Sequence, residues 1–438
     1  MKNAQIRSTM KIPSILINKA KELEEYYNIH YKPLAPLAAR CFLNTMETTV
    51  KQLEDGSYFV ITGDIPAMWL RDSAAQVRPY VKYAAQDREL RDIIEGVIAK
   101  QAEFVCLDPY ANAFNERADG SGHKDETENN DHVWERKYEV DSLCAPLYLG
   151  HAYWKATGVT GIFTPVNKEM IVRILETFIT EQDHSRSKYF FTRHDCVKTD
   201  TLPAGGKGRP VNVTGMTWSG FRPSDDCCKF GYLIPANMMA VTALGYAEEI
   251  SRDVYGDVEL AGRCKALAEE IRDGIMDYGV VNHPKYGRIY AYETDGFGNY
   301  NLMDDANSPS LLAMPYLGYC SREDELYQNT RRFILSEDNP YYNAGSRAAG
   351  MGSPHTPEGY VWHIGIIMQA LTSTDKKEIG NCLEMLADTH AGTNYMHESF
   401  NPEEPEEFTR PWFAWANSLF GELLGTLMEQ GFFDGEEK

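Results

Sequence analysis

The sequence contains no apolar stretch close to the roughly 20 residues that a membrane-spanning helix needs. Its opening segment, MKNAQIRSTMKIPSILINK, also lacks the long apolar run of a signal peptide. We therefore expect a protein without membrane contact and predict a cytoplasmic location.

Positive charge is also scarce, because 43 Lys and Arg residues stand against 64 Asp and Glu residues. The resulting net charge of −21 at pH 7 repels polyanions over most of the surface. This charge argues against nucleic acid as a partner. The sequence does not define an oligomeric state.

The nine cysteines include no C-x-x-C pair, which argues against a structural zinc site or a dithiol redox motif, and we expect buried free thiols. His355 and Glu358, in GSPHTPEG, are residue types that bind metals, but their spacing does not match H-E-x-x-H. Pro354 and Pro357 also disfavour a regular helix that would carry both. We therefore predict no metal site and no cofactor.

Alternating apolar patterns are rare, whereas apolar residues recur every three or four positions along most of the chain, which is typical of helices. The clearest strand is SYFVITG at 57–63, and a polar helix is expected at 17–27. The twelve other predicted helices are 36–53, 70–84, 87–105, 140–157, 167–183, 227–250, 257–277, 308–318, 323–336, 360–373, 375–389 and 412–429.

Long loops rich in Gly, Pro, Asn and aromatic residues precede every second predicted helix, and short connections follow. Six such loops at one end of six helix hairpins predict an all-α (α/α)6 barrel with minor β elements in the loops. No Ser/Gly linker or low-complexity tract divides the chain. We therefore expect one catalytic domain over 1–438, with 1–34 as an N-terminal extension that packs on it and the terminal GEEK as a frayed end.

The six loops share one chemistry, since carboxylates stand beside amide, hydroxyl, His or Arg groups and most loops add a Trp or Tyr. Sugars need this combination, because their hydroxyls bind polar groups while their C–H faces stack on aromatic rings. The loops are GDIPAMWLRDS, NNDHVWERKYEVDS, GMTWSGFRPSDD, DDANSPS, MGSPHTPEGYVWH and MHESFNPEEPEEFTRPWFAWANS. A cup that binds carbohydrate is the expected site.

Glycoside hydrolysis needs two carboxyl groups, one to protonate the leaving oxygen and one to act as nucleophile or to activate water. Asp225 and Asp226 end one loop and are expected to open the helix after it, where they could equally satisfy free N–H groups. A helix N-terminus lowers the pKa of a carboxyl, so an acid there needs burial or a neighbouring carboxylate. Glu398, in MHESFNP, is either the second carboxyl or one more solvated acid.

Other loop residues are candidates for binding the sugar. Arg71 and Asp72 could form a structural ion pair or bind neighbouring hydroxyls. Trp69 and Trp218 are the expected stacking surfaces, although a Trp is more often part of the core. The remaining candidates for hydroxyl ligands are Asn307, His355 and Glu358.

Several of these strings resemble glycoside hydrolase family 125, whose characterised bacterial members are exo-acting α-1,6-mannosidases. The resemblance runs from about residue 35 to 430 and rests on DIPAMWLRDSAAQVRPY, TGMTWSGFRPSDD, KFGYLIPAN, GSPHTPEGY and HESFNP. It implies an (α/α)6 barrel, metal-independent hydrolysis with inversion, and removal of non-reducing terminal α-1,6-linked mannose from a mannose-containing oligosaccharide, either a mannoside or an N-glycan fragment. It also implies that Asp225 is the general acid, with Asp226 as the fallback, and that Glu398 is the general base.

Inversion predicts roughly 6.5–9.5 Å between the two carboxyl groups, enough for the attacking water.

Three alternatives stay open at this point. A calcium-dependent α-mannosidase would need a metal, a sugar epimerase or isomerase would release no monosaccharide, and a carbohydrate-binding protein would turn nothing over.

Overall fold

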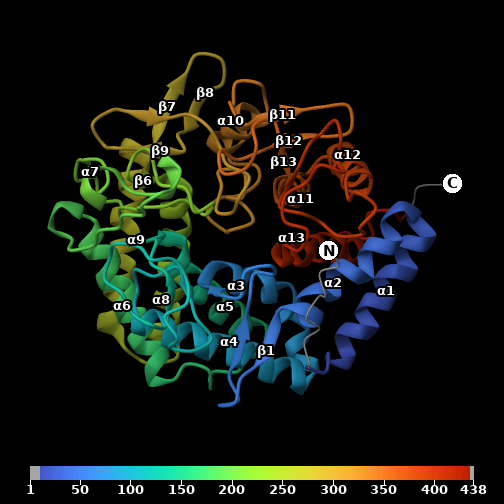
Figure 1. Ribbon diagram of the computed structural model, residues 1–438, viewed down its shortest axis with the longest axis horizontal. Helices are drawn as coiled ribbons and strands as arrows, with labels where there is room; N and C mark the ends of the chain where they lie inside the picture. The colour runs from blue at the N-terminus through green and yellow to red at the C-terminus, as the bar shows by residue number, and fades with distance from the viewer. Residues whose placement is uncertain (1–9, 435–438) are drawn as a thin grey trace.

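A computed structural model describes residues 10–434, and within them helices dominate (Figure 1). The helices are α1 Ser14–His30, α2 Ala35–Thr48, α3 Leu70–Val77, α4 Arg88–Leu107, α5 Val140–Thr157, α6 Pro165–Glu181, α7 Pro203–Gly206, α8 Ile234–Asp253, α9 Val258–Tyr278, α10 Glu325–Ile334, α11 His363–Thr372, α12 Lys376–Asp388 and α13 Ala414–Glu429. Short 3-10 helices cover Lys32–Leu34, Arg78–Gln86, His184–Arg186 and Lys198–Asp200.

The strands are short and all pair antiparallel. Their order in the sheets is β1–β2, β3–β4–β5, β6–β9–β10, β7–β8, β11–β12 and β13–β14. Their bounds are β1 Val50–Gln52, β2 Tyr58–Val60, β3 Met68–Trp69, β4 Ala113–Phe114, β5 Val133–Glu135, β6 Tyr232–Leu233, β7 Val280–His283, β8 Gly287–Tyr290, β9 Glu293–Thr294, β10 Tyr300–Asn301, β11 Tyr342–Ala344, β12 Ala349–Met351, β13 Val361–Trp362 and β14 Ser399–Phe400.

Six successive hairpins form a closed ring, and this confirms the predicted (α/α)6 barrel. The pairs are α2 with α3, α4 with α5, α6 with α8, α9 with the turns at 310–319, α10 with α11, and α12 with α13. The ring closes where α13 packs against α2 and α3, so the first and last helices lie side by side (Figure 1). The long loops before the second member of each pair carry most of the short strands.

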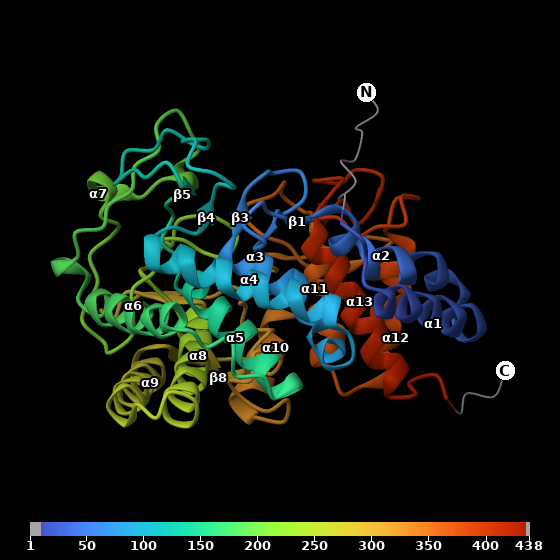
Figure 2. The same ribbon diagram turned by 90° about the horizontal axis from the view of Figure 1, so that it is seen from below.

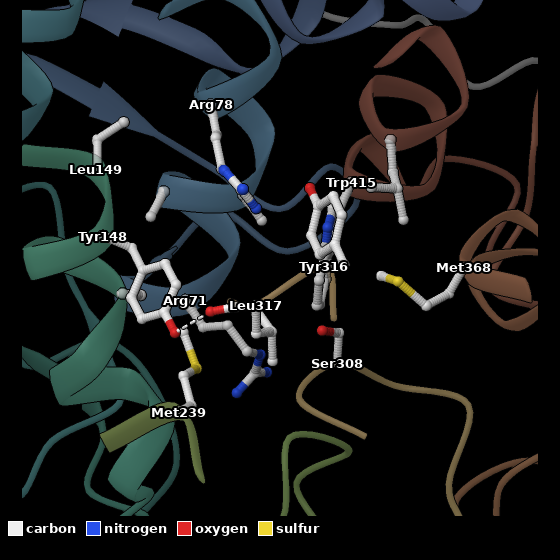
Figure 3. Close-up of a pocket in the computed structure, with 14 residues that line it drawn as sticks. Arg71, Arg78, Tyr148, Leu149, Met239, Ser308, Tyr316, Leu317, Met368 and Trp415 are labelled. Atoms are coloured by element: carbon white, nitrogen blue, oxygen red, sulfur yellow. Dashed lines mark hydrogen bonds between the residues drawn. The ribbon is translucent and has the colours of Figure 1, made fainter. Parts of the chain in front are cut away.

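The barrel axis is filled by side chains from the second member of every hairpin (Figure 3). They enclose a small, largely apolar cavity of about 50 Å³. Its lining includes Arg71, Tyr148, Met239, Leu317, Met368 and Trp415. Arg71 also lines the larger cavity among the loops, so this residue separates the apolar interior from the loop region.

Several predicted helices were wrong in extent. The segment 36–53 is an α-helix only as far as Thr48, because Val50–Gln52 form β1 and pair with β2. The segment 70–84 is an α-helix only as far as Val77 and continues as the 3-10 helix Arg78–Gln86, since Pro79 lacks the N–H that an α-helix interior uses.

The segment expected to be helical from 227 begins only at Ile234, since β6 pairs with β9 up to Leu233 and Pro235 suits the first turn of a helix. The segment 308–318 forms turns rather than a regular helix, because Pro309 and Pro315 lack the N–H that a helix interior uses.

The N-terminal segment packs on the barrel as far as the structure describes it. Leu16, Ala20, Leu23 and Tyr27 of α1 are buried, and their spacing of four, three and four residues places them on one helical face. This face contacts α2 and α13, and the Tyr27 hydroxyl donates a hydrogen bond to the Leu424 carbonyl at 2.9 Å. The predicted tail GEEK lies outside the described residues.

Over residues 10–434, no helix combines the length and the apolar character that crossing a lipid bilayer requires.

We predict that Leu23→Ala lowers the free energy of unfolding by about 2–5 kcal/mol, because it leaves a cavity between α1 and the barrel. Leu23 is 1% exposed, whereas Ile29 on the same helix is 63% exposed. Ile29→Ala is therefore the matched control and should change stability little. Urea unfolding followed by circular dichroism measures both, and equal midpoints for the two variants would contradict the packing of α1.

Candidate active site

The long loops surround a polar cavity of about 230 Å³ at one end of the barrel axis. Its walls hold four carboxylates, two guanidinium groups, one imidazole and three aromatic rings among smaller groups. The lining residues are Thr62, Asp64, Ile65, Trp69, Arg71, Asp72, Pro223, Ser224, Asp225, Asn307, His355, Trp362, Glu398, Arg410 and Phe413. The sequence therefore correctly predicted the polar and aromatic character of the cup.

Short strands place several of these side chains. β3 ends at Trp69, directly before Arg71 and Asp72 in the first turn of α3, and it pairs with β4, which pairs with β5 (Figure 2). Trp362 at the end of β13 pairs with Ser399 of β14, which places the neighbouring Glu398 at the wall of the cavity. Strand pairing thus fixes residues that lie far apart in the sequence.

Asp225 lies in a tight turn rather than at a helix N-terminus, which corrects the sequence prediction. Its backbone is left-handed, with a φ of 70°. The Asp225 N–H donates to the Arg222 carbonyl at 2.9 Å, the Arg222 N–H donates to the Asp226 carbonyl at 2.8 Å, and the buried Lys137 ammonium donates to the Asp225 carbonyl at 2.8 Å. These contacts hold the Asp225 side chain at the cavity wall.

Cations surround the Asp225 carboxyl. Burial would raise the pKa of this group, but the charges of Lys137, Arg71 and His355 outweigh it and hold the pKa below its usual value. The sequence prediction needed burial or a neighbouring carboxylate to keep Asp225 protonated, whereas in the structure three cationic side chains outweigh burial. The direction of this pKa shift is the wrong one for a group that must donate a proton.

Glu398 lines the same cavity and is 6% exposed. The Thr409 hydroxyl donates to its Oε2 at 3.0 Å, and Nη1 of Arg410 lies 3.5 Å from its Oε1. Arg410 is itself fixed, since its Nε donates to Asp64 at 3.0 Å and its guanidinium lies over the Phe413 ring at 4.6 Å. Both carboxylate oxygens are therefore held as acceptors, unlike those of a freely solvated acid.

The first and last of the long loops are paired at the rim of the cavity. The Asp64 N–H donates to the Trp412 carbonyl at 3.3 Å, and the Ala414 N–H donates to the Thr62 carbonyl at 3.1 Å. Gly63 between them has a φ of 140°, and a Cβ there would lie 2.3 Å from the Trp412 oxygen. The close approach that aligns Arg410 with Glu398 therefore requires glycine.

Arg71 makes ion pairs and does not extend freely into the cavity. Its Nη1 lies 2.7 Å from Glu139 and 3.0 Å from Asp141, and its Nη2 lies 3.4 Å from Asp72. Burial raises the pKa of Asp72 although the charges of Arg71 and Arg410 oppose it. The sequence left open whether Arg71 and Asp72 form a structural ion pair or bind hydroxyl groups. The ion pair is present, and Asp72 also lines the cavity.

His355 is positively charged at neutral pH. Burial would lower its pKa, but the hydrogen bond to Asp226, at 3.2 Å from Nδ1, and the charges of Asp226, Asp225 and Glu398 raise it to about 9. Asp226 therefore pairs with His355 and does not line the cavity. Asn307 completes this side, since its amide donates to the Pro223 carbonyl at 2.8 Å.

Two predicted sugar ligands lie outside the cavity. Trp218 is 1% exposed and stacks on His184, with the ring centroids 3.5 Å apart, so its aromatic faces are covered by protein. Glu358 lies in an exposed turn and does not line the cavity. The expectation for these two residues is corrected accordingly, whereas Trp69, Arg71, Asp72, Asn307 and His355 all line the wall.

The geometry agrees with a family of known enzymes. Residues 32–425 match the model of a family described as metal-independent α-mannosidase, GH125. This chain belongs to that family. It is therefore a member of the glycoside hydrolases. Within residues 10–434, we find no group of three or more His, Cys, Asp and Glu side chains arranged to hold a metal ion.

Similar proteins include a structure of a metal-independent α-mannosidase from Streptococcus pneumoniae, described as a non-productive substrate complex with α-1,6-mannobiose. It is 46% identical, with a TM-score of 0.93 over 98% of this chain and 100% of that one. The meiotically up-regulated gene 157 protein of Schizosaccharomyces pombe is 41% identical over 91% of this chain and 82% of its own. A glucoamylase from Saccharomycopsis fibuligera, 13% identical over 98% of both chains with a TM-score of 0.57, shares the fold alone.

Sequence reasoning missed several residues that organise the site of this α-mannosidase. Lys137, Glu139 and Asp141 stand in the quoted loop NNDHVWERKYEVDS or at its end, and this run of charges just before a helix was the available signal. Asn112 gave no such signal, because only the fold brings it to Asp225. Arg410 stands in the same quoted loop as Glu398 but was not singled out.

We predict that the His355 imidazole titrates near pH 9, measured by NMR of protein labelled with ¹⁵N-histidine. Asp226→Asn should lower this pKa, because it removes the paired charge. A raised folded-state pKa also means that the pair stabilises the fold fully below pH 6.5 and loses this effect as the pH rises through 9. Titration of the wild-type ring near pH 6.5 would contradict the ion pair.

Proposed function

We propose that this chain removes non-reducing terminal α-1,6-linked mannose from mannosides or N-glycan fragments, with inversion of the anomeric configuration. The observation that carries the proposal is that Asp225 and Glu398 line one cavity although they are 173 residues apart (398 minus 225). Family membership supports α-mannoside hydrolysis, and the α-1,6-mannobiose in the Streptococcus pneumoniae relative supports the linkage.

In the proposed mechanism, Asp225 protonates the glycosidic oxygen as the bond to the anomeric carbon breaks. Glu398 takes a proton from a water molecule that attacks the opposite face of that carbon. The separation of roughly 6.5–9.5 Å between the two carboxyl groups stays a prediction of this mechanism.

The same cavity supports exo action. Arg71 and Asp72, each 5% exposed, close its inner end, so a terminal sugar would stop against them. We propose that Asp72, Asn307 and His355 bind hydroxyl groups of that sugar and that Trp69 provides an apolar face. Arg71 would orient Asp72 through their ion pair.

The reaction is tested by proton NMR of the protein with α-1,6-mannobiose in excess EDTA. We expect β-mannose as the first product, because water attacks the face opposite the leaving group. Initial α-mannose would overturn inversion, and activity that EDTA abolishes would indicate a calcium-dependent enzyme instead. Binding without any release of mannose would leave only a carbohydrate-binding protein.

The assignment of the two carboxyl groups is tested by Asp225→Asn and Glu398→Gln. Each substitution should lower kcat on α-1,6-mannobiose by about 10²–10⁴-fold. With 2,4-dinitrophenyl α-mannoside, whose leaving group needs no proton, Asp225→Asn should recover most of its activity, while Glu398→Gln should not. Asp226→Asn is the matched control, and recovery by this variant alone would make Asp226 the acid.

A further inference from the structure

A second carboxyl group lies directly beneath the proposed acid. Glu139 is 1% exposed and precedes α5. The Asn112 amide nitrogen lies 3.3 Å from Glu139 Oε1 and 3.4 Å from Asp225 Oδ1, so both carboxyl groups face the same donor. The charge of Asp225 also raises the pKa of Glu139, so the two carboxyl groups interact. Since two like charges in a buried region disfavour each other, this arrangement favours a proton on one of the two.

The balance of charge around Arg71 also favours a stored proton. Glu139, Asp141 and Asp72, each at most 5% exposed, contact the single guanidinium of Arg71. Asp141 Oδ1 has no hydrogen-bond partner among the described residues. Ionising all of these carboxyl groups would leave uncompensated negative charge in a buried region, which is strongly unfavourable.

The neighbouring groups indicate which carboxyl holds the proton in the free protein. Burial and the charges of Asp141 and Asp225 raise the pKa of Glu139 well above its usual value, although Arg71 opposes them. The pKa of Asp225 is lowered, as described above. The charged groups that face this pair are Arg71, Asp72, Glu135, Lys137, Asp141 and His355. These neighbours favour the proton on Glu139 and the negative charge on Asp225.

We propose that Glu139 and Asp225 share one proton, which Glu139 stores as a positioning residue and returns to Asp225 when the glycosidic oxygen arrives. This inference rests on the proposed function. The O–H bond of Glu139 breaks as one forms on Asp225, and Asp225 then passes the proton to the glycosidic oxygen, which keeps the electron pair of the broken C–O bond.

The cycle closes through solvent. Glu398 takes one proton from the attacking water, whose oxygen forms the new bond to the anomeric carbon. Glu398 then releases that proton to bulk water, and the Glu139–Asp225 pair takes one proton back. No oxidant, reductant or further reactant is needed. The arrangement resembles carboxyl pairs that share a proton because two like charges at close range do not both ionise.

Glu139→Gln tests the shared proton, since Gln keeps the shape and a hydrogen-bond donor but cannot transfer a proton. We expect kcat on α-1,6-mannobiose to fall by about 10–100-fold, part of the contribution of general acid catalysis. The alkaline limb of the pH profile of kcat/KM should move to lower pH. Without the second carboxyl group, Asp225 loses its proton at its own pKa, which is lowered. Glu139→Asp, which keeps a carboxyl group, should restore the limb toward its wild-type position.

Glu135→Gln is the matched control. Glu135 is buried and accepts from the same Asn112 amide at 3.0 Å, but its other partners are Arg193 and Lys137. This variant removes a neighbouring charge but leaves both carboxyl groups of the pair, so it should move the alkaline limb much less than Glu139→Gln does. With 2,4-dinitrophenyl α-mannoside, Glu139→Gln should keep kcat within about threefold of wild type, because no proton is required. An equal loss on both substrates, or an unmoved limb, would show a purely structural role and overturn the proposal.

Infrared spectroscopy of the free protein separates this inference from the proposed function. We expect a protonated-carboxyl band at pH 7 that is absent in Glu139→Gln, whether or not mannobiose is hydrolysed. Should that variant fail to fold, Asp225→Asn makes the same test, since loss of the Asp225 charge should lower the pH midpoint of the Glu139 band. An unchanged midpoint overturns the shared proton. A shifted midpoint without hydrolysis of mannobiose overturns the proposed function alone.

Discussion

The buried guanidinium of Arg71 is the interaction on which the cavity depends. It lies at the start of α3 and contacts carboxyl groups from its own helix, from the loop before α5 and from α5 itself. Removing one partner of such a buried cluster typically destabilises a protein by about 3–5 kcal/mol, since unpaired charge stays behind. Because Arg71 lines both cavities, the same contacts also separate the polar cup from the apolar barrel axis.

Around the Arg71 cluster, the barrel helices and the long loops are ordered by different interactions. The helices pack into a ring whose core is continuous, from Leu16 to Phe432. The loops obtain their order from short antiparallel pairs, such as β3 with β4 and β13 with β14, and from the contact of Gly63 with Trp412. These backbone hydrogen bonds fix side chains on long loops that the helices alone would leave free to move. The backbone that carries the cavity residues is therefore tied together by hydrogen bonds between loops.

The fold was more predictable from sequence than the site. Helix α5 matches the predicted 140–157, because its apolar periodicity and the loop before it agree. The start of α8 was misplaced, since the pairing of β6 with β9 is a tertiary contact that no local pattern shows. Asp225 and Glu398 could be selected by residue type and motif. Trp218 could not be recognised as a core residue, because the sequence of a loop does not show whether an aromatic side chain is buried or exposed. Asn112 lies 113 residues from Asp225, and only the barrel brings them together.

The two walls of the cavity differ in the protons they hold. On one side, the loops before α5 and α8 supply Glu139 and Asp225, which face the same Asn112 amide and form the pair proposed to share one proton. On the other side, the loop before α13 supplies Glu398, whose oxygens accept from Thr409 and face Arg410. Inverting hydrolysis needs this asymmetry, since one wall must give a proton while the other receives one. Because the two walls come from different hairpins, the closed ring is what brings Asp225 and Glu398 to one cavity.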